Sequence, residues 1–199
     1  LDFRDFGVRM EGGWSGTMSL PRVLSFGTDG QLLMDVPEEI EALRYNPTPK
    51  RSLTLDAGAD LPIDDINGNS LEILVDMESA DATEYGVKVC VAPDGSEETV
   101  ISYDASAGEL KVDTTRSGPE GTLKGVEAGP FALADGERLQ LRIFIDKSVV
   151  EVFANRRQAV VRRIYPSRPD SVGVSLFARG GNVDVHSLES WEISPSNPY

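Results

Sequence analysis

The chain has 199 residues, 40% of them hydrophobic, so it is long enough to bury a core of ordinary size. Its formal net charge of −14 argues against a nucleic-acid partner, because a polyanion would be repelled. No apolar run approaches the ~18 residues that a membrane-spanning helix needs, so we expect no membrane partner. The single cysteine, Cys90, excludes an internal disulfide framework, and its valine neighbours predict a buried strand thiol.

The first ten residues carry two aspartates and two arginines where a secretory signal would need an apolar core. The sequence also begins at Leu1 and not at an initiator methionine, which is expected of a fragment or a processed product. Nothing in the composition indicates a cellular compartment.

Residues 1–49 predict a hairpin followed by one short helix. Residues 17–26 and 31–36 are strand-like and flank a Thr-Asp-Gly turn. Pro37, two glutamates and Arg44 predict a helix over residues 37–44, because proline and acidic residues suit the start of a helix and a cation suits its end. The Asn-Pro-Thr-Pro run that follows stops the helix. We therefore divide the chain into residues 1–49 and a domain of residues 50–199.

From residue 50 onward the sequence predicts short strands separated by glycine-centred turns. Residues 139–166 give the clearest pattern, because β-branched and polar residues alternate in three runs joined by three-residue turns, as in an antiparallel meander. The other predicted strands are residues 52–55, 70–78, 85–91, 99–103, 109–113, 122–126, 172–178 and 183–191. The whole pattern predicts an all-β protein, a two-sheet antiparallel β-sandwich. Its core should include Ile143, Ile145, Val174, Leu176 and Trp191.

Three features invite a functional interpretation. The acidic stretch at residues 56–69 suggests calcium, but the EF-hand spacing fails, and a solvated loop is the better prediction. His186 is the only histidine and no nucleophile elbow is present, so we expect a structural histidine. Glu151 lies between two valines and should be an outward or interface residue of a β-hairpin.

Arginines and tryptophans leave further alternatives. Four arginines cluster in the meander, and strand alternation predicts that they form its solvated face: Arg156, Arg157, Arg162 and Arg163. Trp14 and Trp191 could stack on sugar rings. Trp191 closes the last strand and should belong to the core. Trp14 lies among glycines and is the more credible contact residue of the two, although packing is the first expectation for it as well.

Several motifs, in order along the chain, resemble one family. GWSGTMSLPR at residues 13–22 and VPEEIEALR at residues 36–44 resemble the segment after the catalytic propeller of glycoside hydrolase family 32. That family comprises invertases, inulinases, levanases and related β-fructofuranosidases. LKVDTTRSG (110–118), LRIFIDKSVVEVFAN (141–155) and GVSLFARGG (173–181) resemble its C-terminal β-sandwich. The resemblance runs over nearly the whole chain from Gly12.

The resemblance implies that the catalytic machinery lies elsewhere. Members of the family hydrolyse with retention on a five-bladed propeller, using an Asp nucleophile and a Glu acid/base. These lie in Trp-Met-Asn-Asp-Pro-Asn, Arg-Asp-Pro and Glu-Cys stretches. Here neither tryptophan precedes Met-Asn, Arg4-Asp5 precedes Phe6, and Val89 precedes Cys90. We therefore expect no catalytic residue, no metal ligand and no cofactor site in this chain.

The function implied by the resemblance is that of a non-catalytic C-terminal domain. The parent enzyme would hydrolyse terminal β-fructofuranosyl bonds in sucrose or fructans. The sandwich would stabilise the propeller and shape the edge of its cleft or a homodimer contact. Expected partners are the N-terminal propeller of the same protein, fructose-containing saccharides and a second copy. Contact with the propeller or with sugar is expected at Trp14, Met18, Leu20 and Arg22. The alternative is a stand-alone carbohydrate-binding or assembly module.

Overall fold

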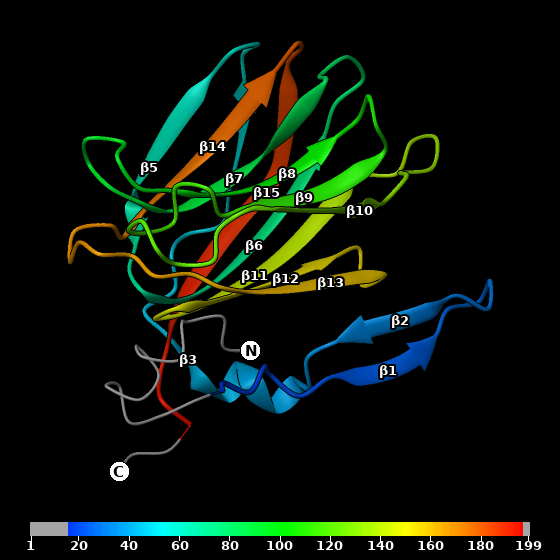
Figure 1. Cartoon of the computed structure of the whole chain (residues 1–199). Helices are drawn as coiled ribbons and strands as arrows, with labels where there is room; N and C mark the ends of the chain where they lie inside the picture. The colour runs from blue at the N-terminus through cyan, green and yellow to red at the C-terminus, as the bar shows by residue number, and fades with distance from the viewer. Residues whose placement is uncertain (1–15, 197–199) are drawn as a thin grey trace.

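The computed structural model describes residues 16–196, in which two antiparallel sheets stack face to face and a two-stranded ribbon stands apart from them (Figure 1). One sheet has six strands in the order β10-β9-β8-β7-β14-β5. The other has seven, in the order β13-β12-β11-β6-β15-β3, with β4 also paired to β15. The strands are β1 Val23–Phe26, β2 Leu32–Asp35, β3 Arg44–Tyr45, β4 Arg51–Leu55, β5 Asp60–Asn67, β6 Ser70–Glu78, β7 Glu84–Val91, β8 Thr99–Asp104, β9 Glu109–Asp113, β10 Val126–Pro130, β11 Leu139–Asp146, β12 Val149–Ala154, β13 Gln158–Arg163, β14 Gly173–Arg179 and β15 Val183–Ile193. The predicted all-β sandwich is confirmed.

The core lies between the two sheets and is filled by alternate residues of their strands. On β11 the inward residues are Leu139, Leu141, Ile143 and Ile145, all buried in one apolar cluster with Val174 and Leu176 of the facing sheet. Cys90 is buried in the same cluster, as its neighbours predicted. Trp191 was placed in the core, and this is wrong. It is half-buried and lies on the opposite side of its strand, next to Glu72 of β6.

The predicted meander is present as β11, β12 and β13. β11 pairs with β12 from Leu141 opposite Ala154 to Asp146 opposite Val149, and β12 pairs with β13. The first turn is tighter than predicted, since only two residues separate the strands, and Lys147 takes a φ of 53° there. The second turn has the predicted three residues.

Two predicted boundaries need correction. The acidic stretch was expected to be a loop, but β5 occupies Asp60–Asn67 as the edge strand of the six-stranded sheet. Edge positions tolerate the proline and the outward aspartates that disguised this strand. The strand predicted at residues 122–126 lies instead at Val126–Pro130, paired with β9.

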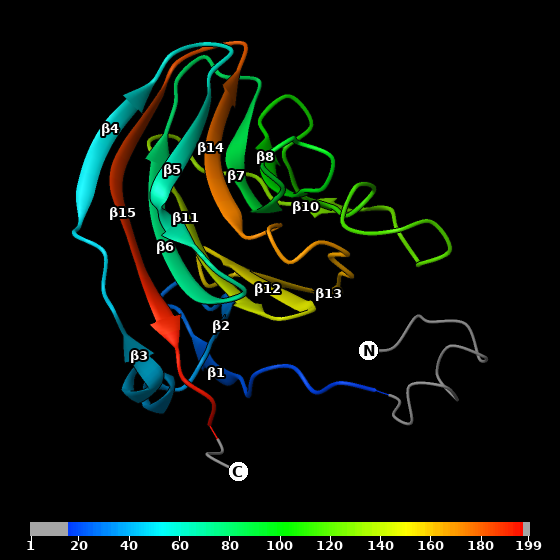
Figure 2. The same cartoon turned by 90° about the vertical axis from the view of Figure 1, so that its left-hand side faces the viewer.

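The residues up to the predicted boundary form a leading segment, defined here as residues 16–49. It contains the hairpin β1–β2, the 3-10 helix η1 (Glu38–Leu43) and β3, which pairs with β15 at the edge of the seven-stranded sheet. A helix was predicted at residues 37–44, and the observed one is shorter and of the 3-10 type. Pro37 is its extended N-cap, and Arg44 is already extended because it begins β3. In Figure 2 the leading segment runs below the seven-stranded sheet, on the side away from the six-stranded one.

Candidate docking face

The outer face of the seven-stranded sheet carries apolar side chains where a solvated face would carry polar ones. Phe144 of β11 and Phe153 of β12 point outward and are buried, with ring centroids 6.2 Å apart and planes at 87°. They form a second apolar cluster with Val36 of the leading segment. Leu20, Ile40 and Ala159 pack against this cluster. The leading segment therefore covers an apolar patch that the sandwich alone would leave open.

Polar contacts fasten the start of the leading segment to the same face. The backbone N–H of Leu20 donates to Oε1 of Glu151 at 2.7 Å, and Arg163 donates to the hydroxyl of Thr17 at 3.0 Å. Glu151 is 4% exposed, on the outward side of β12 beneath the leading segment. Burial raises the pKa of its carboxyl, an effect that the bond from Leu20 partly offsets. The interpretation as an interface residue agrees with this position.

A charge network around the buried Glu72 holds the rest of the leading segment. Glu72, which is 0% exposed, accepts from Arg44 at 2.6 and 2.8 Å and from Nε of Arg142 at 2.7 Å. Arg142 also donates to Asp35 at 3.0 Å, and its Nη2 lies 3.7 Å from Oε1 of Glu41. We call this set the Glu72 network: Asp35, Glu41, Arg44, Glu72, Arg142 and Arg156.

The network also explains the position of Trp191. The guanidinium of Arg44 lies 4.2 Å from the centroid of the indole ring, so the cation covers the ring from the leading-segment side. The hydrogen bond to Glu72 raises the pKa of Arg44 above its usual value. One face of Trp191 is thus already occupied by Arg44.

All four meander arginines were predicted to be solvated, and this is wrong for two of them. Arg162 and Arg163 are both buried. Arg162 lies on the inward side of the edge strand β13 and pairs with Glu127 of β10, so it bridges the open margin between the two sheets. Arg163 lies on the outer face, under the leading segment. Arg156, in contrast, is exposed and pairs with Asp35.

The four residues singled out for contact fall into different settings. Trp14 lies outside the described residues. Met18 is 93% exposed, Leu20 packs into the apolar cluster, and the Arg22 guanidinium lies 5.7 Å from the centroid of the Phe153 ring. Leu20 and Arg22 are therefore part of the contact between the leading segment and the sheet, whereas Met18 points to solvent.

The hairpin β1–β2 carries four of the nine large hydrophobic side chains that are exposed in residues 16–196. Leu24 pairs with Met34, and Phe26, which is 78% exposed, pairs with Leu32, so these four residues share one face. Each strand is hydrogen-bonded to the other, and Met34 N–H also donates to the carbonyl oxygen of Arg156 at 2.7 Å. A two-stranded hairpin with an open apolar face is marginal in water unless something covers it.

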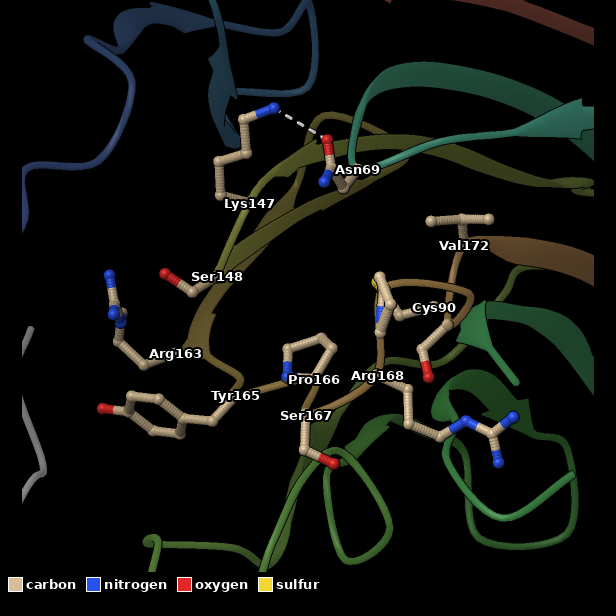
Figure 3. Close-up of a pocket in the computed structure, with 12 residues that line it drawn as sticks. Asn69, Cys90, Lys147, Ser148, Arg163, Tyr165, Pro166, Ser167, Arg168 and Val172 are labelled. Atoms are coloured by element: carbon tan, nitrogen blue, oxygen red, sulfur yellow. Dashed lines mark hydrogen bonds between the residues drawn. The ribbon is translucent and has the colours of Figure 1, made fainter.

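A pocket of about 540 Å³ opens at one end of the sandwich, but its polar groups do not converge (Figure 3). Lys147 points to Asn69 and donates to its side-chain oxygen at 2.7 Å. Arg168 points away from Arg163 and Tyr165 and pairs with Asp94 and Asp170. The loop around Ser167 is held by hydrogen bonds to the buried Glu97. The pocket is a polar end of the sandwich, and Lys147, Arg163 and Arg168 in its lining each already contact a polar or acidic group of the chain.

The remaining candidates can also be placed in the structure. His186 faces Glu78 across an exposed pair at 2.8 Å. No group of three or more potential metal ligands occurs anywhere in residues 16–196. The same part of the chain contains no helix that is both long and apolar enough to cross a membrane.

Comparison with known proteins gives a consistent set of similarities. Residues 39–192 match the family model described as "Glycosyl hydrolases family 32 C terminal". A sucrose-6-phosphate hydrolase of Zymomonas mobilis is 30% identical over 93% of this chain and 36% of its own length. The raffinose invertase of Escherichia coli is 33% identical over 91% of this chain and 36% of its length. The levanase of Bacillus subtilis is 30% identical over 88% of this chain and 27% of its own length.

Solved structures share the fold. The fructan 1-exohydrolase IIa of Cichorium intybus superposes with a TM-score of 0.87 at 19% identity, over 98% of this chain and 44% of that one. An exo-inulinase of Aspergillus awamori superposes with a TM-score of 0.76 at 22% identity, over 88% of this chain and 35% of that one. The chain therefore spans less than half the length of these relatives.

Proposed function

The chain belongs to glycoside hydrolase family 32, as the C-terminal domain of that family, and we propose that it is a non-catalytic sandwich whose leading segment docks the N-terminal propeller of the same protein. The observation that carries this proposal is the open apolar face of the hairpin β1–β2, next to the exposed Met18. A face of this kind on a strongly acidic protein needs an apolar cover.

The relatives supply the nature of the partner and of the reaction. The chain spans 27–36% of the curated relatives named above, which leaves most of each relative without a counterpart here. These relatives are named as hydrolases of sucrose 6-phosphate, levan and raffinose. We propose that the parent protein hydrolyses terminal β-fructofuranosyl bonds in sucrose or fructans, and that the sandwich stabilises the propeller and shapes the edge of its cleft.

The alternative of a stand-alone carbohydrate-binding module has less support. Sugar recognition on a sandwich face relies on exposed aromatic rings. Among residues 16–196 the exposed aromatic side chains are Phe26 and Tyr45, which lie on different elements, and the Tyr45 hydroxyl donates to Glu192.

The test is to express the propeller encoded upstream and this chain as two polypeptides and to measure their association. We expect a stable complex with the unmodified chain and loss of that complex when Leu24 and Phe26 are both replaced by Asp. Leu61→Asp is the matched control, because Leu61 is exposed by 39% on β5, in the other sheet. The proposal is wrong if the hairpin variant associates as well as the control.

Two further outcomes distinguish the alternatives. If the chain alone binds inulin or levan and the hairpin variant binds equally well, it is a carbohydrate-binding module. If the chain alone forms a dimer that the hairpin variant abolishes and no propeller associates, the hairpin is a contact between two copies. Circular dichroism of each variant checks that the sandwich itself is intact.

A further inference from the structure

The Glu72 network connects one buried carboxylate on the sheet to three places on the leading segment. Glu72 contacts Arg44 directly, at the end of η1, and through Arg142 it reaches Asp35 at the end of β2 and Glu41 within η1. The exit of the hairpin, the helix and the start of β3 are thus all tied to the middle of the seven-stranded sheet.

The apolar contacts beneath the leading segment lack this directionality. Leu20, Val36 and Ile40 pack on two phenylalanine rings, and such contacts gain energy from area removed from water with little dependence on direction. A segment held by apolar contacts alone can shift along the rings at small cost. Bidentate arginine–carboxylate bonds, in contrast, fix both distance and angle.

A buried ion network of this kind is a poor source of net stability. Removing charges from water is costly, and replacing a buried ionic set by apolar residues of similar volume is often neutral or stabilising. The buried Glu72 with its two arginines is therefore better explained by a role in fixing one orientation of the leading segment on the sheet than by a gain in stability.

We propose that Glu72 is a positioning residue, which fixes the direction in which the hairpin β1–β2 leaves the sandwich and so presents the hairpin's apolar face in one orientation. This inference rests on the proposed function in one respect: the fixed orientation of the hairpin is useful because the propeller would dock on it. The geometric claim concerns this chain alone.

The test measures the position of the hairpin relative to the sandwich by pulsed electron paramagnetic resonance. Spin labels are attached at Thr28→Cys in the hairpin turn and at Asp64→Cys on β5, both exposed in the structure. Cys90 can remain, because burial raises the pKa of its thiol to about 12 and so keeps it from reacting with the label. We expect one narrow distance distribution in the otherwise unmodified chain.

Three variants decide the matter. Glu72→Gln should shift or broaden the distribution, whereas Glu78→Gln, an exposed position at the end of the same strand, should leave it unchanged. Combined replacement of Glu72, Arg44 and Arg142 by Met keeps an apolar fit, so the chain should fold, yet the single narrow peak should be lost.

A narrow, unshifted distribution in a folded triple variant would show that packing and the backbone bond from Met34 to Arg156 orient the hairpin without the Glu72 network, and the inference would be wrong. Since no partner is present in this experiment, its result is independent of whether a propeller docks. If the two polypeptides fail to associate while the otherwise unmodified chain still gives one narrow distance distribution, the proposed function is wrong and the positioning role of Glu72 stands.

Discussion

Replacing Phe153 by Ala tests whether the leading segment really seals the outer face of the seven-stranded sheet. Phe153 is 2% exposed and meets Phe144 edge to face at a centroid distance of 6.2 Å. Truncation of a buried phenylalanine typically costs ~3–5 kcal/mol, through lost transfer energy and the cavity left behind. The cover here is a single segment that can settle into the space, so we expect the lower end, ~3 kcal/mol.

The measurement is urea unfolding followed by circular dichroism, with the free energy of unfolding extrapolated to water. Phe26→Ala is the matched control, because it removes the same side chain from a position that is 78% exposed, and we expect it to change stability by less than ~0.5 kcal/mol. A cost below ~1 kcal/mol for Phe153→Ala would mean that this ring is not sealed beneath the leading segment.

Four more outcomes are expected. Burial raises the folded-state pKa of Glu151 above 4.5, so the stability that its protonated carboxyl contributes is fully present below pH 4.5 and is lost as pH rises through the raised pKa. Glu151→Gln should therefore be more stable than the unmodified chain at pH 7 and equal to it near pH 4. Equal stability of the two proteins at both pH values would contradict the raised pKa. Ile143→Ala in the main core should cost ~2–5 kcal/mol in the same urea assay, and a cost near zero would place this side chain at the surface. Amides of residues 17–33 should exchange faster than those of residues 141–153 in a demonstrated monomer, since β1 and β2 pair chiefly with each other; equal protection would make the segment integral to the sandwich. The purified chain should not turn over sucrose, inulin or levan, and activity that survives repurification would refute this.

Local pattern was sufficient for most of the sandwich. The alternation of Leu141, Ile143 and Ile145 predicted both a strand and its buried side, because a period of two assigns each residue to one face. The same reasoning missed β5, where Asp60 and Pro62 look like a loop. Only the position of β5 at a sheet edge makes those residues acceptable in a strand.

The docking face was harder to predict because its pairs are distant in sequence. Strand alternation placed Arg163 on one side of β13, but it could not show that Thr17, 146 residues away, would cover that side. Likewise Trp191 has the size and apolarity of a core residue, but it lies opposite Glu72 on the outer face, where Arg44 covers it. Glu151 was expected to be an outward or interface residue, and it lies on the outer face beneath Leu20. The role of Glu72 was not predicted, although an acid between Leu71 and Ile73 in a strongly apolar strand was an indication of a buried ion pair.

The seven-stranded sheet cannot be completed until β15 has been synthesised. This strand follows every other strand of its sheet in the chain, yet it lies between β6 and β4, pairing Asp184 with Glu78 and Val183 with Leu55. On a ribosome that adds ~5–20 residues per second, the open edge of β6 waits on the order of 5–20 seconds for a partner that is about a hundred residues away. During that interval β4 has no partner in its sheet, and both strands are exposed to pairing with other chains. Nascent chains should therefore depend on chaperones until β15 emerges, and a ribosome stalled before Val183 should accumulate aggregating product while one stalled well after Ile193 should not.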